Sequence, residues 1–553
     1  MKQTNNAIKF LMAQYRAIFK NANIAMVAAI AAAALASGQA QAATGQTFTN
    51  DTFKKDAAVE VTMDGTDTAD DTKGQYKNFT ISGSSGDAAF TNDQANVLTV
   101  TGGSGASGSV FKGKDANGTG TISLAKTSLV IAGTKDNSTD TVVSIGEGTS
   151  GAAVTLGSVT AEKGTLDVVK GSLTAGTLTL NNKALLKLTD GDVSADSITL
   201  ESGSVVDITK GSLGKAGNTI TVAAGAKIDT QATDNTNAKV LSNLDVSGTL
   251  NVDASKAIKI EGEANFLSGS TFVSKGVTVL AKGGSIDDKA TLTVEAGSDI
   301  RIGDATLTLS SDNLKKLISG TKVQSMSDKK AVIALNDETS AEKALDLATT
   351  TIIGASDGVV SAKLVKQGTS GSLTVQGGYA KYAGENKIEG QEGVTLSFKG
   401  LTVGKDAAVS FNKGGISVSE SLSIKDKKAL TLDSGNALTL DGATGSVDAA
   451  SVTIGSSAAA GTLNVKNGTW TLPDLTVTSG SATVEDQATL KVNGKLTATK
   501  AGQLLVKGGT VDVQGSGSSL VLASAEAKTV QLSAGGVLKI DPESHIIEAR
   551  NQE

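Results

Sequence analysis

Few side chains in this sequence are suited to chemistry. The 553-residue chain has no cysteine and one histidine, His545, eight residues before its end. A Ser/His/Asp hydrolase is excluded by this inventory, because Ser434 in the segment LDSGN has no partner base and is interpreted as a corner residue. Cysteine nucleophiles and zinc sites are also excluded, because the chain has no cysteine and only one histidine. The sequence therefore predicts no catalytic residue, no metal site and no cofactor, and we expect the protein not to be an enzyme.

Paired carboxylates are the remaining route to catalysis. Asp167 and Asp207 occupy equivalent positions of an internal repeat, and Lys187 occupies the same position between them. Two acids about 5 to 10 Å apart can cleave glycosidic bonds, so a polysaccharide lyase or glycosidase is an alternative. The alternation of charge favours a balanced, solvated outer face.

Two further segments suggest ligands. The segment KDANGTG (114–120) gives only part of a calcium loop and lacks the bidentate Glu, so we interpret it as a turn. Trp470 is the only tryptophan and lies in GTWTLPDL. An exposed tryptophan can bind a sugar ring, which makes Trp470 the one candidate for carbohydrate contact, although we favour a packing role.

An internal repeat must position all of these residues. The segment GSLTAGTLTL (171–180) is matched by GDVSADSITL (191–200), with glycines at Gly171, Gly191 and Gly211. After Leu213 the apolar residues arrive two positions late. Self-similarity at a period near twenty is typical of a solenoid, in which each repeat forms one coil.

Within each coil the apolar residues stand two apart, as in Leu178-Thr179-Leu180, which is the spacing of one face of a β-strand. Glycines fall between these strands, where tight corners need them. The pattern predicts an all-β fold, a parallel β-helix with coils of about twenty residues and roughly twenty coils, or a rod on the order of 100 Å long at ~4.8 Å per coil. Aromatic residues make up 3% of the chain, and we expect them to fit awkwardly between closely stacked coils.

The repeat divides the chain into regions. Residues 43–120 are irregular and cap or begin the solenoid, with candidate strands at 97–103 and 120–124. Residues 121–309 form a proximal solenoid, residues 351–540 a distal one, and residues 541–553 a tail. Between the two solenoids, residues 310–350 form a helical excursion that leaves the stack, so each half should keep its own core.

Two short helices are expected in this excursion. SSDNLKKLISG (310–320) has Leu314, Leu317 and Ile318 at helical spacing after Asp312 or Asn313 as the cap. In TSAEKALDLATT (339–350), Thr339 and Glu342 are placed as a capping box.

The first 42 residues resemble a signal peptide with a long basic region. Four basic residues precede an apolar run at 24–36 and the triplet Ala40-Gln41-Ala42, so we expect cleavage after Ala42. Removing this segment takes away four positive and no negative charges, which moves the formal net charge from −6 to about −10. An acidic chain without a basic stripe is not expected to bind nucleic acid.

The basic leader ending at Ala42 and the cysteine-free Gly/Thr/Val/Leu repeats at 121–540 resemble the passenger region of autotransporters, the type V secreted proteins of Gram-negative bacteria. The resemblance implies a right-handed parallel β-helix displayed at, or released from, the cell surface. It also implies an outer-membrane translocator barrel, which we expect on a missing segment or a separate chain, since the sequence stops at LKIDPESHIIEARNQE.

The expected function is that of an adhesin-like binding and structural protein. Its partners would be host or sister-cell surfaces, extracellular matrix or a glycan. Besides the polysaccharide lyase or glycosidase, a self-assembling surface-layer or biofilm matrix component is an alternative.

Overall fold

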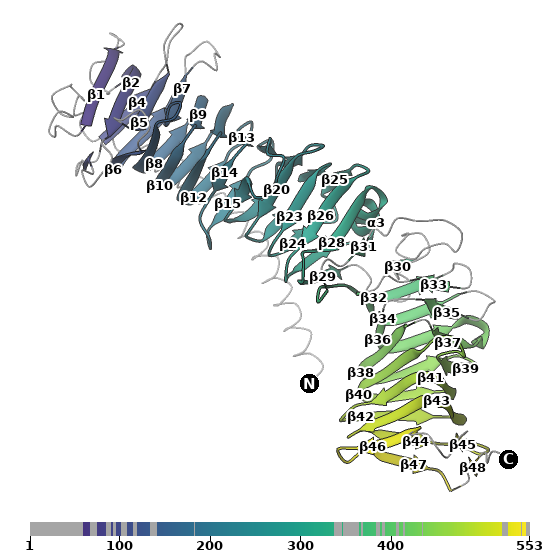
Figure 1. Cartoon of the computed structure of the whole chain (residues 1–553). Helices are drawn as coiled ribbons and strands as arrows, with labels where there is room; N and C mark the ends of the chain where they lie inside the picture. The colour runs from purple at the N-terminus through teal and green to yellow at the C-terminus, as the bar shows by residue number, and fades with distance from the viewer. Residues whose placement is uncertain are drawn as a thin grey trace, which may run out of the picture.

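The alternation of inward apolar and outward polar residues produces a stack of parallel coils. The computed structural model describes residues 59–66, 75–83, 90–91, 96–100, 108–113, 119–132, 141–181, 183–336, 345–346, 364–365, 369–382, 387–389, 393–404, 409–412, 415–433, 435–522, 529–542 and 545–548. Of the described residues, 68% lie in strands and 3% in helices, and they form a parallel β-solenoid of about 15 turns with about 22 residues per turn. Figure 1 shows the elongated stack, whose direction changes between β29 and β32.

The predicted all-β fold class and the parallel solenoid are confirmed. The sequence repeat predicted roughly twenty coils of about twenty residues, and the structure has about 15 turns of about 22 residues. With about 15 turns, spaced ~4.8 Å apart, the stack is about 70 Å long when measured along its coils.

The stack already begins within residues 43–120. Here β1 pairs antiparallel with β2, and all later strand pairs in the described residues are parallel. The strands expected at 97–103 and 120–124 are present as β4 and β6, which pair with each other. The strands of this end are β1 (Val59–Thr66), β2 (Gln75–Gly83), β3 (Phe90–Thr91), β4 (Asn96–Val100), β5 (Ser109–Gly113), β6 (Thr119–Ile131), β7 (Val142–Ile145), β8 (Gly151–Ala161) and β9 (Gly164–Val168).

The register of the central coils follows the sequence repeat. Leu173 pairs with Val193 and Leu178 with Ile198, as predicted. The slip after Leu213 is also confirmed, because Ile198 pairs with Ile220. The strands of this part are β10 (Gly171–Leu180), β11 (Ala184–Leu188), β12 (Gly191–Leu200), β13 (Val205–Ile208), β14 (Gly211–Leu213), β15 (Thr219–Val222), β16 (Lys227–Thr230), β17 (Ala238–Val240), β18 (Asn243–Val246), β19 (Thr249–Val252), β20 (Ala257–Ile260), β21 (Ala264–Phe266), β22 (Thr271–Ser274), β23 (Val277–Leu280), β24 (Gly284–Ile286), β25 (Thr291–Val294), β26 (Ser298–Ile302), β27 (Thr306–Leu309), β28 (Thr321–Ser325) and β29 (Lys330–Leu335).

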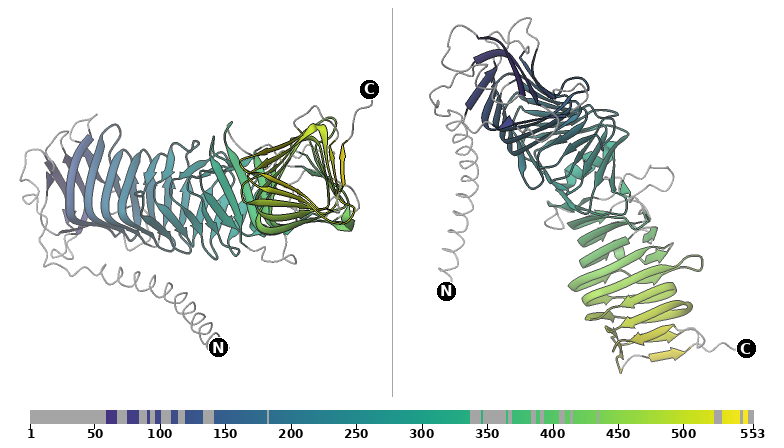
Figure 2. Two further views of the ribbon diagram at one scale, coloured as in Figure 1. Left: turned by 90° about the horizontal axis from the view of Figure 1, so that it is seen from below. Right: turned by 60° about the vertical axis from the view of Figure 1, so that its left-hand side comes forward.

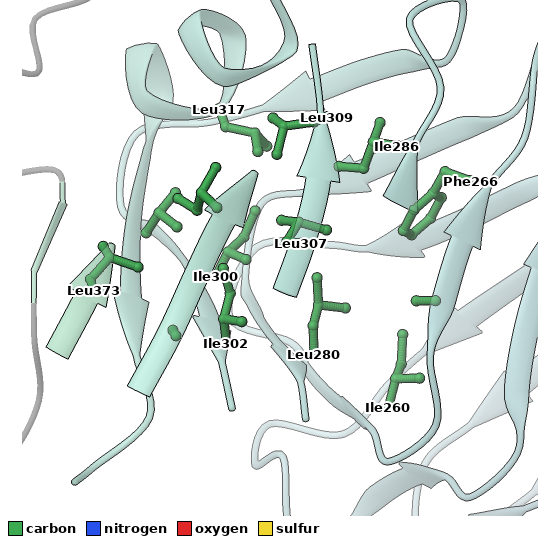
Figure 3. Close-up of a cluster of buried hydrophobic side chains, with 14 of the residues drawn as sticks. Ile260, Phe266, Leu280, Ile286, Ile300, Ile302, Leu307, Leu309, Leu317 and Leu373 are labelled. Atoms are coloured by element: carbon green, nitrogen blue, oxygen red, sulfur yellow. The ribbon is translucent and has the colours of Figure 1, made fainter. Parts of the chain in front are cut away.

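The helix predicted at 310–320 is present as α3 (Ser311–Gly320). Its cap is Ser310, whose hydroxyl accepts the Asn313 N–H at 3.3 Å, rather than Asp312 or Asn313. Leu314, Leu317 and Ile318 are fully buried, so α3 covers the core beside β25 and β28. Figure 3 shows Leu317 packed toward Leu309 and Ile286.

The predicted departure of residues 310–350 from the stack is wrong for most of the segment that is described. After α3, β28 pairs in parallel with β26, and β29 with β27. The helix lengthens one coil, and the ladder resumes behind it. Of the second predicted helix, residues 339–344 and 347–350 lie outside the described residues, while Leu345–Asp346 form β30, a short strand paired with β32.

The distal coils continue the same core. β29 pairs with β32, and Leu373 of β32 lies in the cluster that contains Ile302 (Figure 3). The strands of this part are β30 (Leu345–Asp346), β31 (Leu364–Val365), β32 (Ser372–Tyr382), β33 (Lys387–Glu389), β34 (Val394–Val403), β35 (Val409–Asn412), β36 (Gly415–Ile424), β37 (Leu430–Asp433), β38 (Ala437–Asp448), β39 (Ser451–Ile454), β40 (Gly461–Leu472), β41 (Asp474–Val484), β42 (Ala488–Val492), β43 (Lys495–Lys507), β44 (Thr510–Val513), β45 (Ser519–Leu522), β46 (Val530–Ser533), β47 (Val537–Ile540) and β48 (His545–Glu548), with a 3₁₀ turn, η2 (Lys425–Lys427), between β36 and β37.

The described part of the predicted tail is also inside the ladder. β48 pairs in parallel with β45, with His545 opposite Ser519. Seen nearly end-on in the left view of Figure 2, the distal coils have a three-sided outline.

The interior accepts more aromatic side chains than expected. Phe79 and Phe111 meet edge to face at 4.8 Å, and Phe266 stacks on Phe272 at 4.5 Å. All four are buried. Aromatic residues are therefore accommodated where a second ring lies on the neighbouring rung, as for Phe79 and Phe111, or on the next strand of the same coil, as for Phe266 and Phe272. For Trp470 the neighbouring rung supplies a glycine.

Candidate functional site

Several residues singled out in the sequence lie outside the described residues. These are Ala40 and Ala42 of the expected cleavage site, Ser434, and residues 114–118 of the calcium-like segment. His545 is described, and it is an exposed residue of β48.

The side chain of Trp470 is not exposed to solvent. Its side chain is 0% exposed, and Gly445 of the preceding coil lies opposite it. The candidate carbohydrate contact at Trp470 is therefore wrong, and the packing role is the correct one. Its Nε1 has no hydrogen-bond partner among the described residues.

Asp167, Lys187 and Asp207 stack in one outward column, as their repeat positions predicted. Asp167 pairs with Lys187 across β9 and β11, and Lys187 with Asp207 across β11 and β13. The column continues through Asp229 of β16 and Asn251 of β19. Successive members are one rung apart, ~4.8 Å between backbones, so Asp207 and Asp229 are neighbouring acids of like charge.

Asp207 is the electrostatically perturbed member of this column. Burial, followed by the Asp229 charge, raises its pKa above the ordinary value, against the opposing effects of Gln231, Lys187 and Lys227. Its Oδ1 has no hydrogen-bond partner in the part of the chain that is described.

Asp229, in contrast, is well paired. Lys227 lies at 2.8 Å from its carboxylate, and Asn251 donates to it at 2.8 Å. The column thus places an acid with a raised pKa beside an acid whose carboxylate has a lysine and an amide as partners.

A polar depression of about 480 Å³ lies on a different face, across β10, β12, β14 and β17 as far as Glu261, the residue after β20. Its floor includes the column Gly171, Gly191 and Gly211. Gly171 and Gly211 have φ values of +119° and +126°, and a Cβ on Gly211 would lie 1.8 Å from the carbonyl oxygen of Gly191. Close stacking therefore requires glycine here, and the missing side chains leave the floor open.

Charged side chains form the walls of this first depression. Asp190 and Lys210 pair at 2.8 Å, and the Asp192 carboxylate accepts both the N–H and the hydroxyl of Ser212, at 2.8 and 2.5 Å. The Lys239 ammonium also lines the depression and has no hydrogen-bond or ion-pair partner among the described residues.

A second depression, of about 490 Å³, begins one corner further along the stack. Glu261 lines the first depression and Glu263 the second, with only Gly262 between them. In the second, Ser285 donates to Asn265 at 3.0 Å, and Asn265 donates to Asp245 at 3.1 Å. This ladder of hydrogen bonds fixes the polar side chains in place.

Asp304 closes the far side of the second depression. The Lys330 N–H donates to its carboxylate at 2.5 Å and is the main cause that lowers the pKa of Asp304, with Lys329 nearby at 3.3 Å.

The sequence did not predict either depression. The glycine repeat was visible in the sequence. The sequence did not show that Ala238 pairs with Gly211 and ends the column, so that the glycines form the floor of a depression. The only signal was the alternation Lys170-Gly171, Asp190-Gly191, Lys210-Gly211 at one corner.

Fold and site together define a protein of the parallel β-solenoid class whose outer faces carry ordered polar columns. No protein-family model, curated protein or solved structure matches the chain. Within the described residues, no group of three or more His, Cys, Asp or Glu side chains is placed to hold a metal ion. No helix in that part of the chain has the length and hydropathy needed to cross a membrane.

Proposed function

We propose that this chain is an exported, adhesin-like binding and structural protein, held at or released from the cell surface. The observation that carries the proposal is the continuous parallel ladder, whose outward residues form fixed polar columns and two adjoining depressions. Solenoids present such repeating features along a single axis, which suits extended or multivalent partners. The leader at residues 1–42 supports export, and a translocator barrel on another segment or chain would carry the protein across an outer membrane.

Attachment assays test this proposal. We expect the purified mature chain, residues 43–553, to bind host cells, extracellular matrix or sister cells in a saturable manner. Deleting the coding sequence should reduce attachment or biofilm formation. Binding to none of these surfaces, together with unchanged attachment after deletion, would contradict the proposal.

A carbohydrate-active enzyme is the second candidate, and one observation favours it. Asp207 and Asp229 stand one rung apart, a separation near the ~5 Å of retaining glycosidases, and burial raises the pKa of Asp207. The column lies outside both depressions. Reducing-sugar release from a panel of polysaccharides, absent in both Asp207→Asn and Asp229→Asn, would support this candidate. No release by the wild-type chain would exclude it.

A further inference from the structure

We propose that the two depressions form one groove for an uncharged, hydroxyl-rich polysaccharide chain. The inference rests on the proposed surface function and names the site and the ligand class. The two depressions adjoin at the corner formed by Glu261, Gly262 and Glu263. Together they follow the stack from the coil of Gly171 to the coil of Thr306, a course along the axis that suits a linear polymer.

The lining matches sugar hydroxyls. Hydroxyl groups both donate and accept hydrogen bonds, so they pair equally well with carboxylates, amides and ammonium groups. The groove offers all three kinds, and several are already oriented: Asp192 by Ser212, and Asn265 between Asp245 and Ser285. Preoriented groups lose little conformational entropy when a ligand binds.

The charges in the groove disfavour a polyelectrolyte. Acidic and basic side chains are mixed along it, with Asp190 beside Lys210 in the first depression and both Glu263 and Lys282 in the lining of the second. Asp190 and Lys210 neutralise each other. Lys239, Glu263 and Lys282 have no side-chain partner among the described residues. A polyanion would meet acids and a polycation would meet lysines, whereas an uncharged glycan would meet hydrogen-bonding groups throughout.

A peptide fits the groove less well. Extended peptides bind by adding a strand to a free sheet edge or by filling apolar pockets. The strands that form the groove have no free edge: β14, β17 and β20 each pair on both sides. Leu241 and Ala305 are the only apolar residues besides glycine in the lining.

No aromatic residue lines the two depressions, so stacking on sugar rings does not contribute. Each sugar unit is therefore held by hydrogen bonds alone, and useful affinity arises from many units bound along one chain. Binding should be weak for short oligosaccharides and stronger for polymers.

The experiment uses residues 43–553 and an immobilised panel of uncharged polysaccharides (α-glucan, β-glucan, galactan and mannan), with polygalacturonate as a polyanion and a mixed peptide library. We expect binding to at least one uncharged polymer, with an apparent Kd that changes less than about threefold between 0.15 and 1 M NaCl, because few ion pairs form. Binding to no uncharged polymer, binding only to polygalacturonate, or preferential binding of peptides overturns the inference.

Two groove variants and one control locate the binding. Ser212→Tyr on β14 places a ring across the first depression, and Asn265→Ala breaks the hydrogen-bond ladder of the second. Each should weaken binding by about tenfold, or ~1.4 kcal/mol. Thr249→Tyr on β19, an outward hydroxyl residue on another face, should leave binding unchanged. If Ser212→Tyr fails to fold by circular dichroism, Lys239→Ala replaces it.

Unchanged binding in all groove variants contradicts the inference. This result is distinguishable from failure of the proposed function. A chain that attaches to cells but binds no polysaccharide refutes only the groove, whereas one that binds polysaccharide through Ser212 and Asn265 but attaches to no surface refutes only the adhesin-like role.

Discussion

Gly445 and Trp470 share one space between neighbouring coils. A Cβ on Gly445 would lie 2.4 Å from the Cη2 and Cζ3 atoms of the Trp470 ring. The ring is fully buried and cannot move aside. Position 445 therefore requires glycine, because any Cβ there would overlap the Trp470 ring.

We predict that Gly445→Ala destabilises the chain by about 1–3 kcal/mol, the usual cost of overpacking. Gly415→Ala in β36 is the control, because the nearest atom to its Cβ is the Thr395 hydroxyl at 3.3 Å, at the end of a side chain. Urea denaturation followed by tryptophan fluorescence compares the two variants. Equal midpoints would show that the ring has room to shift.

Because the pKa of Asp207 is raised, we expect the stability of the chain to depend on pH. Its pKa is raised in the folded chain, mainly by burial and then by Asp229, so the protonated form is favoured on folding. The stabilising contribution is complete below the ordinary aspartate pKa and is lost as the pH rises through the raised value. At neutral pH the ionised Asp207 therefore weakens the fold.

Asp207→Asn should thus stabilise the chain at pH 7 by less than about 1 kcal/mol, given the partial exposure of the site, and the gain should vanish as the solution is acidified below the ordinary aspartate pKa. Thermal melts at a series of pH values measure it. The matched variant Asp167→Asn, at an equivalent position of the column, replaces the charged acceptor of the Thr189 hydroxyl with a neutral amide oxygen and should not stabilise. A gain that persists in acid would contradict this account.

At the scale of elements, α3 closes the core at the lengthened coil. Leu317 is 0% exposed, while Lys316 on the same helix faces solvent. We predict that Leu317→Ala costs about 2–5 kcal/mol and that Lys316→Ala is nearly neutral. Chemical denaturation followed by circular dichroism tests the difference. Similar stabilities for both variants would mean that α3 is detached from the core in solution.

The same region gives a second element-scale prediction. Replacing residues 312–348 with a short Gly/Ser linker removes β28, β29 and most of α3. Both strands belong to the ladder. We therefore expect a weaker β-sheet signal in circular dichroism and new proteolytic cleavage near residue 300. A segment outside the stack could be replaced without either effect. Retention of the full β-signal would instead show that residues 312–348 lie outside the ladder.

Sequence periodicity predicted those elements whose coils keep the twenty-residue spacing. Leu186, Val206 and Ile228 fall in register because their alternation with polar residues fixes which face is buried. β28 and β29 were missed because α3 lies inside their coil and breaks the period. The long coils near the N-terminus, such as Thr119 opposite Gly151, hide the period in the same way.

The candidate site was predictable only in part. The stacking of Asp167, Lys187 and Asp207 followed from the repeat, but the first depression depends on the longer coil that ends the glycine column at Ala238. No local pattern encodes that arrangement, because it arises from packing between coils of unequal length.

At the scale of the whole molecule, the core is one continuous cluster from Phe79 to Leu520. Each coil contacts its neighbours, so damage at one rung weakens those on either side. Val206 is fully buried between Leu186 and Ile228. We predict that Val206→Asp costs on the order of 4 kcal/mol or more by burying an unpaired charge, and that limited proteolysis then cuts within the adjacent coils.

Val205→Asp is the matched control, because this neighbouring side chain points outward from the same strand. It should leave the protease pattern and the circular dichroism spectrum unchanged. Identical behaviour of the two variants would place the core on the wrong face of β13.

Trp470 also gives the molecule an optical property. It is the only tryptophan in the chain, and its indole is shielded from water on β40. Its emission therefore reports the surroundings of a few distal coils, whereas far-ultraviolet ellipticity averages over the entire stack. If the two signals change at different denaturant concentrations, the order in which they change reveals which end of the solenoid opens first, without any attached dye.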